Sequence, residues 1–102
     1  MNWLVYMILA SDNSIYTGIT TNIERRWRQH LTGMGGAKYF RSRDPKWLIY
    51  LEHNHNRSSA LRREMTIKKM TKEQKWLQID NKNNQVHTLS INLPVWRGNP
   101  HT

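Results

Sequence analysis

The apolar run Trp3–Ala10, close to the start of the chain, is the feature that most constrains the fold. Its 8 residues are apolar at odd and even positions alike, so a strand formed here must be covered on both faces. The run ends at Ser11 and Asp12, far short of the roughly 20 residues that a membrane span needs. It is therefore predicted to be an inner strand of a sheet, and no membrane association is expected.

A β-hairpin is predicted at this end of the chain. Turn-forming residues 11–14 separate the first strand from Ile15–Ile19, which returns as the second strand. Tyr6 and Tyr16 share a face of the sheet only if the loop has an odd number of residues, such as 12–14. The sequence does not decide between the two registers.

The remaining elements are predicted from capping residues and apolar spacing. Thr21 and Glu24 match a capping box, which predicts a helix that runs to about Leu31. Further along we expect a strand over Trp47–Glu52, a helix over about Ser59–Met70 with Ser58 as N-cap, and a short helix over Lys72–Gln78 that begins with a Thr71–Gln74 capping box.

The order β-β-α-β-α-α predicts the α/β class in its α+β form, a three-stranded antiparallel sheet flanked by helices. Residues 1–80 are predicted to form this domain. Residues 81–102, with a tail from Pro94 onward, are predicted to be a partly irregular C-terminal extension.

The charge of the chain indicates its partner. The 102 residues include 16 Lys and Arg against 7 Asp and Glu, which gives a formal net charge of +9. Such a balance predicts a polyanionic partner, with nucleic acid as the first candidate. The chain has no cysteine, which excludes disulfides, thiolate nucleophiles and thiolate zinc sites and fits a cytoplasmic protein.

Two proton-carrying or charged side chains border the apolar stripe of the first helix. Ile23, Trp27 and Leu31 form that stripe, and Arg26 and His30 lie beside it, one turn apart and facing the same way. The pair is a candidate for chemistry. The alternative is that Arg26 extends over the sheet edge and that His30 caps a carbonyl near the helix end.

Glu64 falls inside the apolar arc of the second predicted helix. A carboxylate that faces a core is costly unless a cation or a hydrogen-bond donor meets it. An ion pair with Lys68 one turn later, a hydrogen bond from Tyr50 and a bound metal ion would each satisfy it. The sequence leaves these alternatives open.

Several of these positions together resemble the GIY-YIG endonuclease superfamily, in particular its small single-domain bacterial branch, the YhbQ-like proteins. The resemblance covers roughly Trp3 to Leu77. It is carried by Tyr6, the Tyr16-Thr17-Gly18 triplet ten residues later, Arg26, His30 and the glutamate Glu64 on the next long helix.

This resemblance implies a metal-dependent endonuclease that hydrolyses phosphodiester bonds of nucleic acid, with DNA favoured over RNA. It assigns catalytic roles to Tyr6 and Tyr16 as the tyrosines of the two half-motifs and to Arg26 as the phosphate-stabilising group. His30, which also receives a catalytic role, matches the His-or-Tyr position one turn after Arg26. Glu64 matches the single carboxylate that holds one Mg²⁺ (or Mn²⁺) ion.

The sequence also departs from the family pattern. Thr17 replaces the central isoleucine of the second half-motif, and Ile19 follows Gly18 where some members carry a lysine. Lys38 or Lys68 could complete the site instead. The alternative function is a catalytically weak or inactive nucleic-acid-binding module with the same fold.

Basic and aromatic residues around the predicted site are candidates for contacts with nucleic acid. Gly18 would let a phosphate approach the backbone, and Tyr39 could stack on an unpaired base. The predicted contact set is Gly18, Arg25, Arg28, Lys38, Tyr39, Arg41, Arg43 and Lys68. With no further domain predicted, specificity would come from the glycine-rich loop, the tail, a homodimer or a protein partner.

Overall fold

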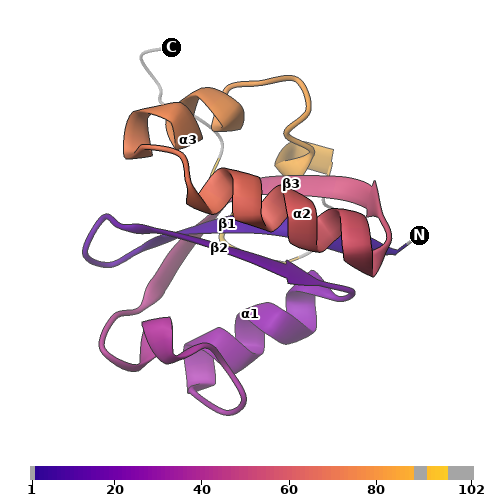
Figure 1. Cartoon of the computed structure of the whole chain (residues 1–102). Coiled ribbons are helices and arrows are strands. Elements are labelled where there is room, and N and C mark those ends of the chain that lie inside the picture. The colour runs from indigo at the N-terminus through magenta and orange to yellow at the C-terminus, as the bar shows by residue number, and fades with distance from the viewer. Residues whose placement is uncertain (1, 89–91, 97–102) are drawn as a thin grey trace.

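A computed structural model describes residues 2–88 and 92–96 (Figure 1). Three strands, β1 (Trp3–Ala10), β2 (Ile15–Thr20) and β3 (Pro45–His55), form an antiparallel sheet in the order β2-β1-β3. Helix α1 (Ile23–Thr32) covers one face, and α2 (Arg57–Lys68) and α3 (Lys72–Ile79) cover the other. The predicted α+β class and element order are confirmed.

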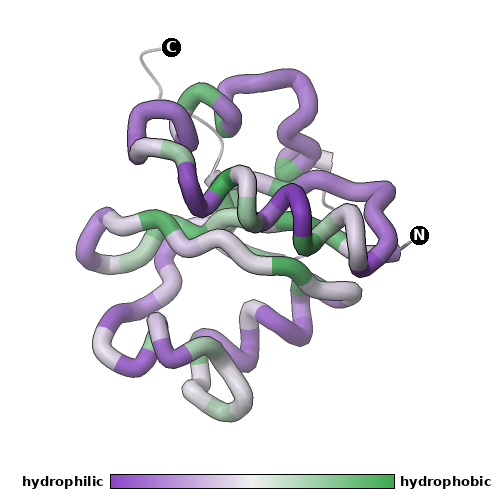
Figure 2. Tube along the Cα trace, viewed as in Figure 1, coloured by the Kyte–Doolittle hydropathy of each residue, from purple (hydrophilic) through white to green (hydrophobic). Residues whose placement is uncertain are grey.

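Both faces of β1 are buried, as its uninterrupted apolar sequence predicts. Tyr6 and Ile8 face α1 and pack with Trp27, whereas Val5 and Met7 face α2 and α3. Figure 2 shows the hydrophobic residues concentrated in the sheet between the two helical layers. The middle strand therefore belongs to two separate cores, one on each face.

Two of the three helix starts differ from the prediction. Asn22, and not Thr21, is the N-cap of α1, and its side chain accepts the Arg25 N–H at 3.0 Å. Asn56, and not Ser58, is the N-cap of α2. In both places an asparagine close by takes the role, since its carbonyl is as good an acceptor as a hydroxyl. The predicted Thr71–Gln74 capping box of α3 is confirmed.

The apolar stripe of α1 is also shifted relative to the prediction. Ile23, Trp27 and His30 are the buried residues of the helix, and Leu31 is 57% exposed. In the last turn of α1, His30 takes the inward position, which leaves its neighbour Leu31 toward solvent. None of the helices in the described residues is long and apolar enough to cross a membrane.

The chain after Ile79 lies along the outer edge of β3. The Leu51 N–H donates to the Asn84 side chain at 3.1 Å, and the short 3₁₀ turn Val86–Thr88 follows. Further on, the Leu48 N–H donates to the Pro94 carbonyl and the Trp96 N–H donates to the Leu48 carbonyl, both at 2.9 Å. The part of the predicted extension that the structure describes thus packs on the domain; its other residues, 89–91 and 97–102, lie outside the described part of the chain.

Candidate active site

The hairpin register brings the two tyrosines to the same face of the sheet. Ile8 pairs with Tyr16 and Tyr6 pairs with Gly18, so both tyrosine side chains point toward α1. Their ring centroids are 6.2 Å apart. Of the two registers that the sequence allowed, the structure has the one that a shared site requires.

Gly18 provides the space for this pair of rings. A Cβ atom at this position would lie 2.6 Å from the Tyr6 hydroxyl oxygen and 3.0 Å from a ring carbon of Tyr16. Any side chain here would therefore displace one of the phenols. This contact gives Gly18 a role beyond the backbone access predicted from the sequence.

His30 connects the helix to the sheet. Its Nδ1 accepts the Ala37 N–H at 3.3 Å, so in the neutral ring the proton is on Nε2, which donates to the Tyr6 hydroxyl at 2.8 Å. Burial, together with the positive charge of Arg26, lowers the pKa of His30 to about 4. His30 is therefore neutral at physiological pH, and both of its nitrogens are occupied.

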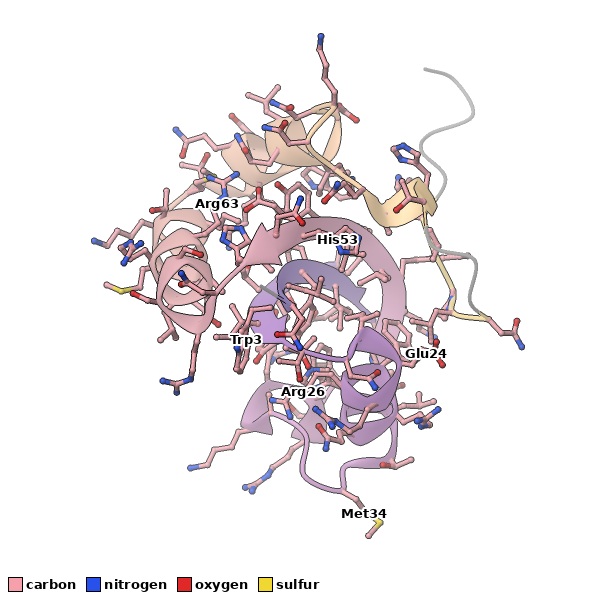
Figure 3. The ribbon with its side chains drawn as sticks, turned by 90° about the vertical axis from the view of Figure 1, so that its right-hand side faces the viewer. Trp3, Glu24, Arg26, Met34, His53 and Arg63 are labelled. Carbon is pink, nitrogen blue, oxygen red and sulfur yellow. The ribbon has the colours of Figure 1, made fainter. Side chains whose placement is uncertain are left out.

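Arg26 lies one turn before His30 and is anchored by the loop that follows α1. Its Nη1 donates to the Gln29 side chain at 3.0 Å and to the Gly35 carbonyl at 2.9 Å. Burial opposes its charge, but hydrogen bonding and charge interactions with Tyr6 and Tyr16 raise the pKa of Arg26 overall. Arg26, which is labelled in Figure 3, thus holds a positive charge beside both phenols.

The two phenols are in different environments. Tyr6 is fully buried, and this burial raises its pKa, helped by Tyr16 and opposed by Arg26. Since its oxygen already accepts the His30 proton, the Tyr6 O–H is available to a neighbouring oxygen. Tyr16 is only partly buried and lies on the edge strand β2, so it is the phenol that faces the outside of the site.

Glu64 comes from the other side of the sheet. It belongs to α2, which packs against β2 and β1 on the face opposite α1. Its side chain is 16% exposed, and the Lys68 ammonium lies 3.5 Å from Oε2. Tyr6, Tyr16, Arg26 and His30 are thus brought together on one face, whereas Glu64 lies across edge strand β2 from them.

The comparisons with known proteins identify the family. A model of the GIY-YIG catalytic domain matches residues 2–84. The chain belongs to the GIY-YIG family. Similar curated proteins are UPF0213 protein DP2720 of Desulfotalea psychrophila and UPF0213 protein YhbQ of Escherichia coli strain K12, each 45% identical over 73 residues. These matches span 72% of this chain and 66% and 72%, respectively, of the relatives.

A solved structure supports the same family. The solution NMR structure of the UPF0213 protein BH0048 from Bacillus halodurans is 35% identical, with a TM-score of 0.52 over 81% of this chain and 87% of that one. The chain is therefore a member of a nuclease family, in the small single-domain bacterial branch. The UPF0213 names of these relatives specify no activity.

The basic residues predicted to contact nucleic acid fall into two groups in this GIY-YIG domain. Arg43 is engaged within the protein, because it forms an ion pair with Asp12 at 2.8 Å and lies 4.0 Å over the ring of Tyr39. Tyr39 itself packs edge-on against Tyr16. The exposed basic residues are Arg25, Arg28, Lys38, Arg41 and Lys68.

Sequence reasoning missed the loop that holds His30 in this GIY-YIG site. Ala37 contributes only its backbone N–H, and Gly36 lets the loop come close, since a Cβ there would lie 2.4 Å from the Gln29 carbonyl oxygen. Phe40 covers His30, with ring centroids 4.7 Å apart. The one sequence signal was the glycine pair at 35–36, which indicates a close approach of the chain to itself.

A second partly buried carboxylate, also missed, lies between β3 and α2. Glu52 accepts hydrogen bonds from Tyr50 at 2.5 Å, from His55 at 2.6 Å and from Arg63 at 3.2 Å. Burial opposes its charge, but these donors lower the pKa of Glu52 overall. Tyr50 therefore bonds to Glu52 and not to Glu64, which removes one alternative for Glu64.

Proposed function

We propose that the chain is a divalent-metal-dependent endonuclease that hydrolyses phosphodiester bonds of nucleic acid, with DNA favoured over RNA. The observation that carries the proposal is the convergence of Tyr6, Tyr16, Arg26 and His30 beside edge strand β2. In a chain of a nuclease family, such a cluster of one cation and two phenols suits the hydrolysis of a phosphate ester.

The chain's own residues have separate tasks in this mechanism. Arg26 stabilises the negative charge that develops on the phosphoryl oxygens as water attacks phosphorus. Tyr16, the phenol that faces the outside of the site, acts as the general base that takes the proton of that water. His30 acts as a positioning residue, because it holds Tyr6 by a 2.8 Å hydrogen bond and has no free nitrogen to serve as the base.

Glu64 would hold one Mg²⁺ (or Mn²⁺) ion. The described residues contain no group of three metal-ligating side chains, but a single carboxylate suits Mg²⁺, which keeps several waters and also binds substrate phosphates. The Glu64 side chain remains 16% exposed, and its partner Lys68 is 53% exposed and free to move aside. When bound, the ion supplies Lewis-acid stabilisation of the leaving oxygen.

One observation favours the second candidate, a nucleic-acid-binding module that does not hydrolyse. The Glu64 carboxylate is already paired with Lys68, and its helix α2 lies on the face of the sheet opposite α1, the helix that carries Arg26. If this pair persists when nucleic acid binds, the domain has the charge to bind phosphates but no ligand for a metal ion.

A Glu64→Ala variant separates the two functions. Cleavage of labelled single-stranded, duplex, branched and RNA substrates is measured with Mg²⁺ or Mn²⁺, and binding is measured in EDTA. We expect cleavage to fall at least about 100-fold, equivalent to about 3 kcal/mol, because removal of the ligand affects the transition state. Binding should stay equal or become slightly tighter, since a carboxylate that repels phosphate is gone.

The matched control is Glu73→Ala, which removes an exposed carboxylate from α3 with the same change in net charge. It should leave cleavage unchanged. Added Mg²⁺ should raise the melting temperature of the wild type and of Glu73→Ala but not that of Glu64→Ala. Undiminished cleavage by Glu64→Ala would contradict the mechanism. If the wild type binds nucleic acid but cleaves none of the substrates, the second candidate, a binding module that does not hydrolyse, would be the function supported.

A further inference from the structure

Three tryptophans gather where β3, α3 and the C-terminal segment meet. Trp47 begins the apolar part of β3, Trp76 lies on α3, and Trp96 lies between them, with ring centroids 6.0 Å from Trp47 and 6.3 Å from Trp76. Both contacts are edge-on, with interplanar angles of 74° and 62°. Despite these contacts Trp47 remains 40% exposed.

The cluster is held rigidly by the backbone. Two hydrogen bonds of 2.9 Å fix Trp96 and Pro94 to Leu48, the residue next to Trp47. Val95, between them, is buried in the core on the α1 face. Because the Trp47 indole already packs against Trp96, a ligand that stacks on it would meet a reduced cost in conformational entropy.

The surface around the cluster is strongly basic. Positions 68–75 contain four lysines and one glutamate, at the end of α2 and the start of α3. Lys72 lies one helical turn before Trp76 on the same side of α3. Burial and the charge of Lys68 lower the pKa of Lys75, so two ammonium groups approach each other here, and an anion between them would relieve the repulsion.

The cluster also lies partly outside the domain that the family shares. The family model ends at residue 84, whereas Trp96 completes the cluster. The surface thus includes residues beyond those that the family model matches, and it lies on the same side of the sheet as helix α2, which carries Glu64.

We propose that Trp47, supported by Trp96 and Trp76, stacks on an unpaired base, and that Lys68, Lys72 and Lys75 bind the phosphates of the same strand. Flat aromatic side chains combined with lysines suit single-stranded nucleic acid, since every base has a face to stack and every nucleotide has a phosphate. Bases inside a duplex are stacked on each other and cannot reach Trp47. The inference rests on the proposed function and adds a preference for substrates with an unpaired strand.

Trp47→Ala tests the inference by binding measurements on the full chain in EDTA, so that cleavage plays no part. The probes are a short fluorescein-labelled single strand and a blunt hairpin duplex of the same length. We expect affinity for the single strand to fall about tenfold, the loss of one stacked base, and affinity for the duplex to stay within about twofold. Trp47→Phe should recover most of the single-strand affinity.

The matched control is Met65→Ala, which truncates another exposed apolar side chain, 57% exposed on α2, without changing charge. It should bind both probes as the wild type does. Circular dichroism and melting temperature establish that the variants are folded, and Trp47→Phe keeps the test decisive if Trp47→Ala unfolds. Single strand should also quench the tryptophan fluorescence of the wild type more than duplex does.

Three results would overturn the inference. Equal binding of the single strand by Trp47→Ala and wild type, with duplex binding and cleavage intact, would refute the stacking surface and leave the nuclease proposal standing. Self-association that Trp47→Ala abolishes would assign the surface to a second copy of the chain. Failure of the wild type to bind or cleave any nucleic acid would refute both proposals.

Discussion

His30 illustrates how a backbone group decides the chemistry of a side chain. The Ala37 N–H occupies Nδ1, and this puts the proton of the neutral ring on Nε2, toward Tyr6. The imidazole is therefore a donor in the site and not a proton acceptor. Its lowered pKa, about 4, keeps this arrangement intact over the physiological range.

This environment predicts a pH dependence of stability. Between about pH 6.5, the ordinary pKa of histidine, and about pH 4, the unfolded chain binds a proton at His30 and the folded chain does not. The free energy of unfolding should thus be highest above pH 6.5 and fall, by up to about 3 kcal/mol from this group, as the pH is lowered toward 4.

Urea unfolding at a series of pH values measures the effect, with His30→Gln as the comparison. The variant cannot titrate at this position, so the difference in unfolding free energy between the two proteins should depend on pH within that interval. A constant difference from pH 4 to pH 7 would mean that the buried imidazole is not held in its neutral form.

For individual residues, the sequence predicted which side chains belong to the candidate site but not the hydrogen bonds that hold them. The spacing of Arg26 and His30 on one helix face was sufficient to pair them, because helical geometry is regular. The hydrogen bond from the Ala37 N–H to His30 could not be predicted, since the sequence does not indicate which backbone N–H meets a side chain. Whether Glu64 and Arg26 lie on the same side of the sheet depends on how α2 packs. A helical wheel carries no information about that packing.

At the scale of elements, the segment after α3 substitutes for a fourth strand. Asn84 is its central residue, and its buried side chain makes four hydrogen bonds: it accepts from Leu51 and Val86 and donates to the carbonyls of Ile49 and Ile79. It thereby ties β3 to the end of α3. All polar atoms of this amide are satisfied without water.

Asn84→Ala should be strongly destabilising. The substitution leaves four buried backbone groups without a partner, and we expect the free energy of unfolding to fall by about 3 kcal/mol or more. Thermal and urea unfolding measure the loss. Asn83→Ala, the same change at the exposed neighbouring position, should cost less than about 0.5 kcal/mol; similar losses for both variants would contradict the role of Asn84.

The strands and helices were predictable from the sequence because each has a local signal. The apolar run of β1 and the capping box of α3 are such signals, and both were interpreted correctly. Asn84 gave none, since an asparagine in a polar stretch looks like any loop residue. The helix starts at Asn22 and Asn56 were misplaced because two or three adjacent residues can serve as the cap.

At the scale of the whole molecule, the basic side chains behind the net charge of +9 are of two kinds. Some are exposed and unpaired, and others are held in ion pairs within the protein. On the α1 side, the predicted contact residues that are exposed and pair with no described carboxylate are Arg25, Arg28, Lys38 and Arg41. Arg43 is paired with Asp12 and adds little to the attraction of phosphates. We therefore expect these exposed residues to make about four phosphate contacts.

Duplex binding should therefore depend on salt with a slope of log affinity against log salt of about −3 to −4. Affinities measured between about 50 and 200 mM KCl give the slope. Arg28→Ala should make it shallower by about 0.9, whereas Arg43→Ala, an equal change in net charge, should not. A slope near zero for the wild type would be incompatible with binding through phosphates.

The two edges of the sheet differ in a way that bears on assembly. The outer edge of β3 is occupied by the chain's own residues at Leu48 and Leu51, whereas β2 pairs only with β1 within the described part of the chain. Any strand that extended the sheet, from a second copy or another protein, would have to add at β2. Since Tyr16 lies on that strand, between the helices that carry Arg26 and Glu64, a strand added to the sheet would lie beside the residues of the proposed site and would compete with a nucleic-acid strand for the same edge.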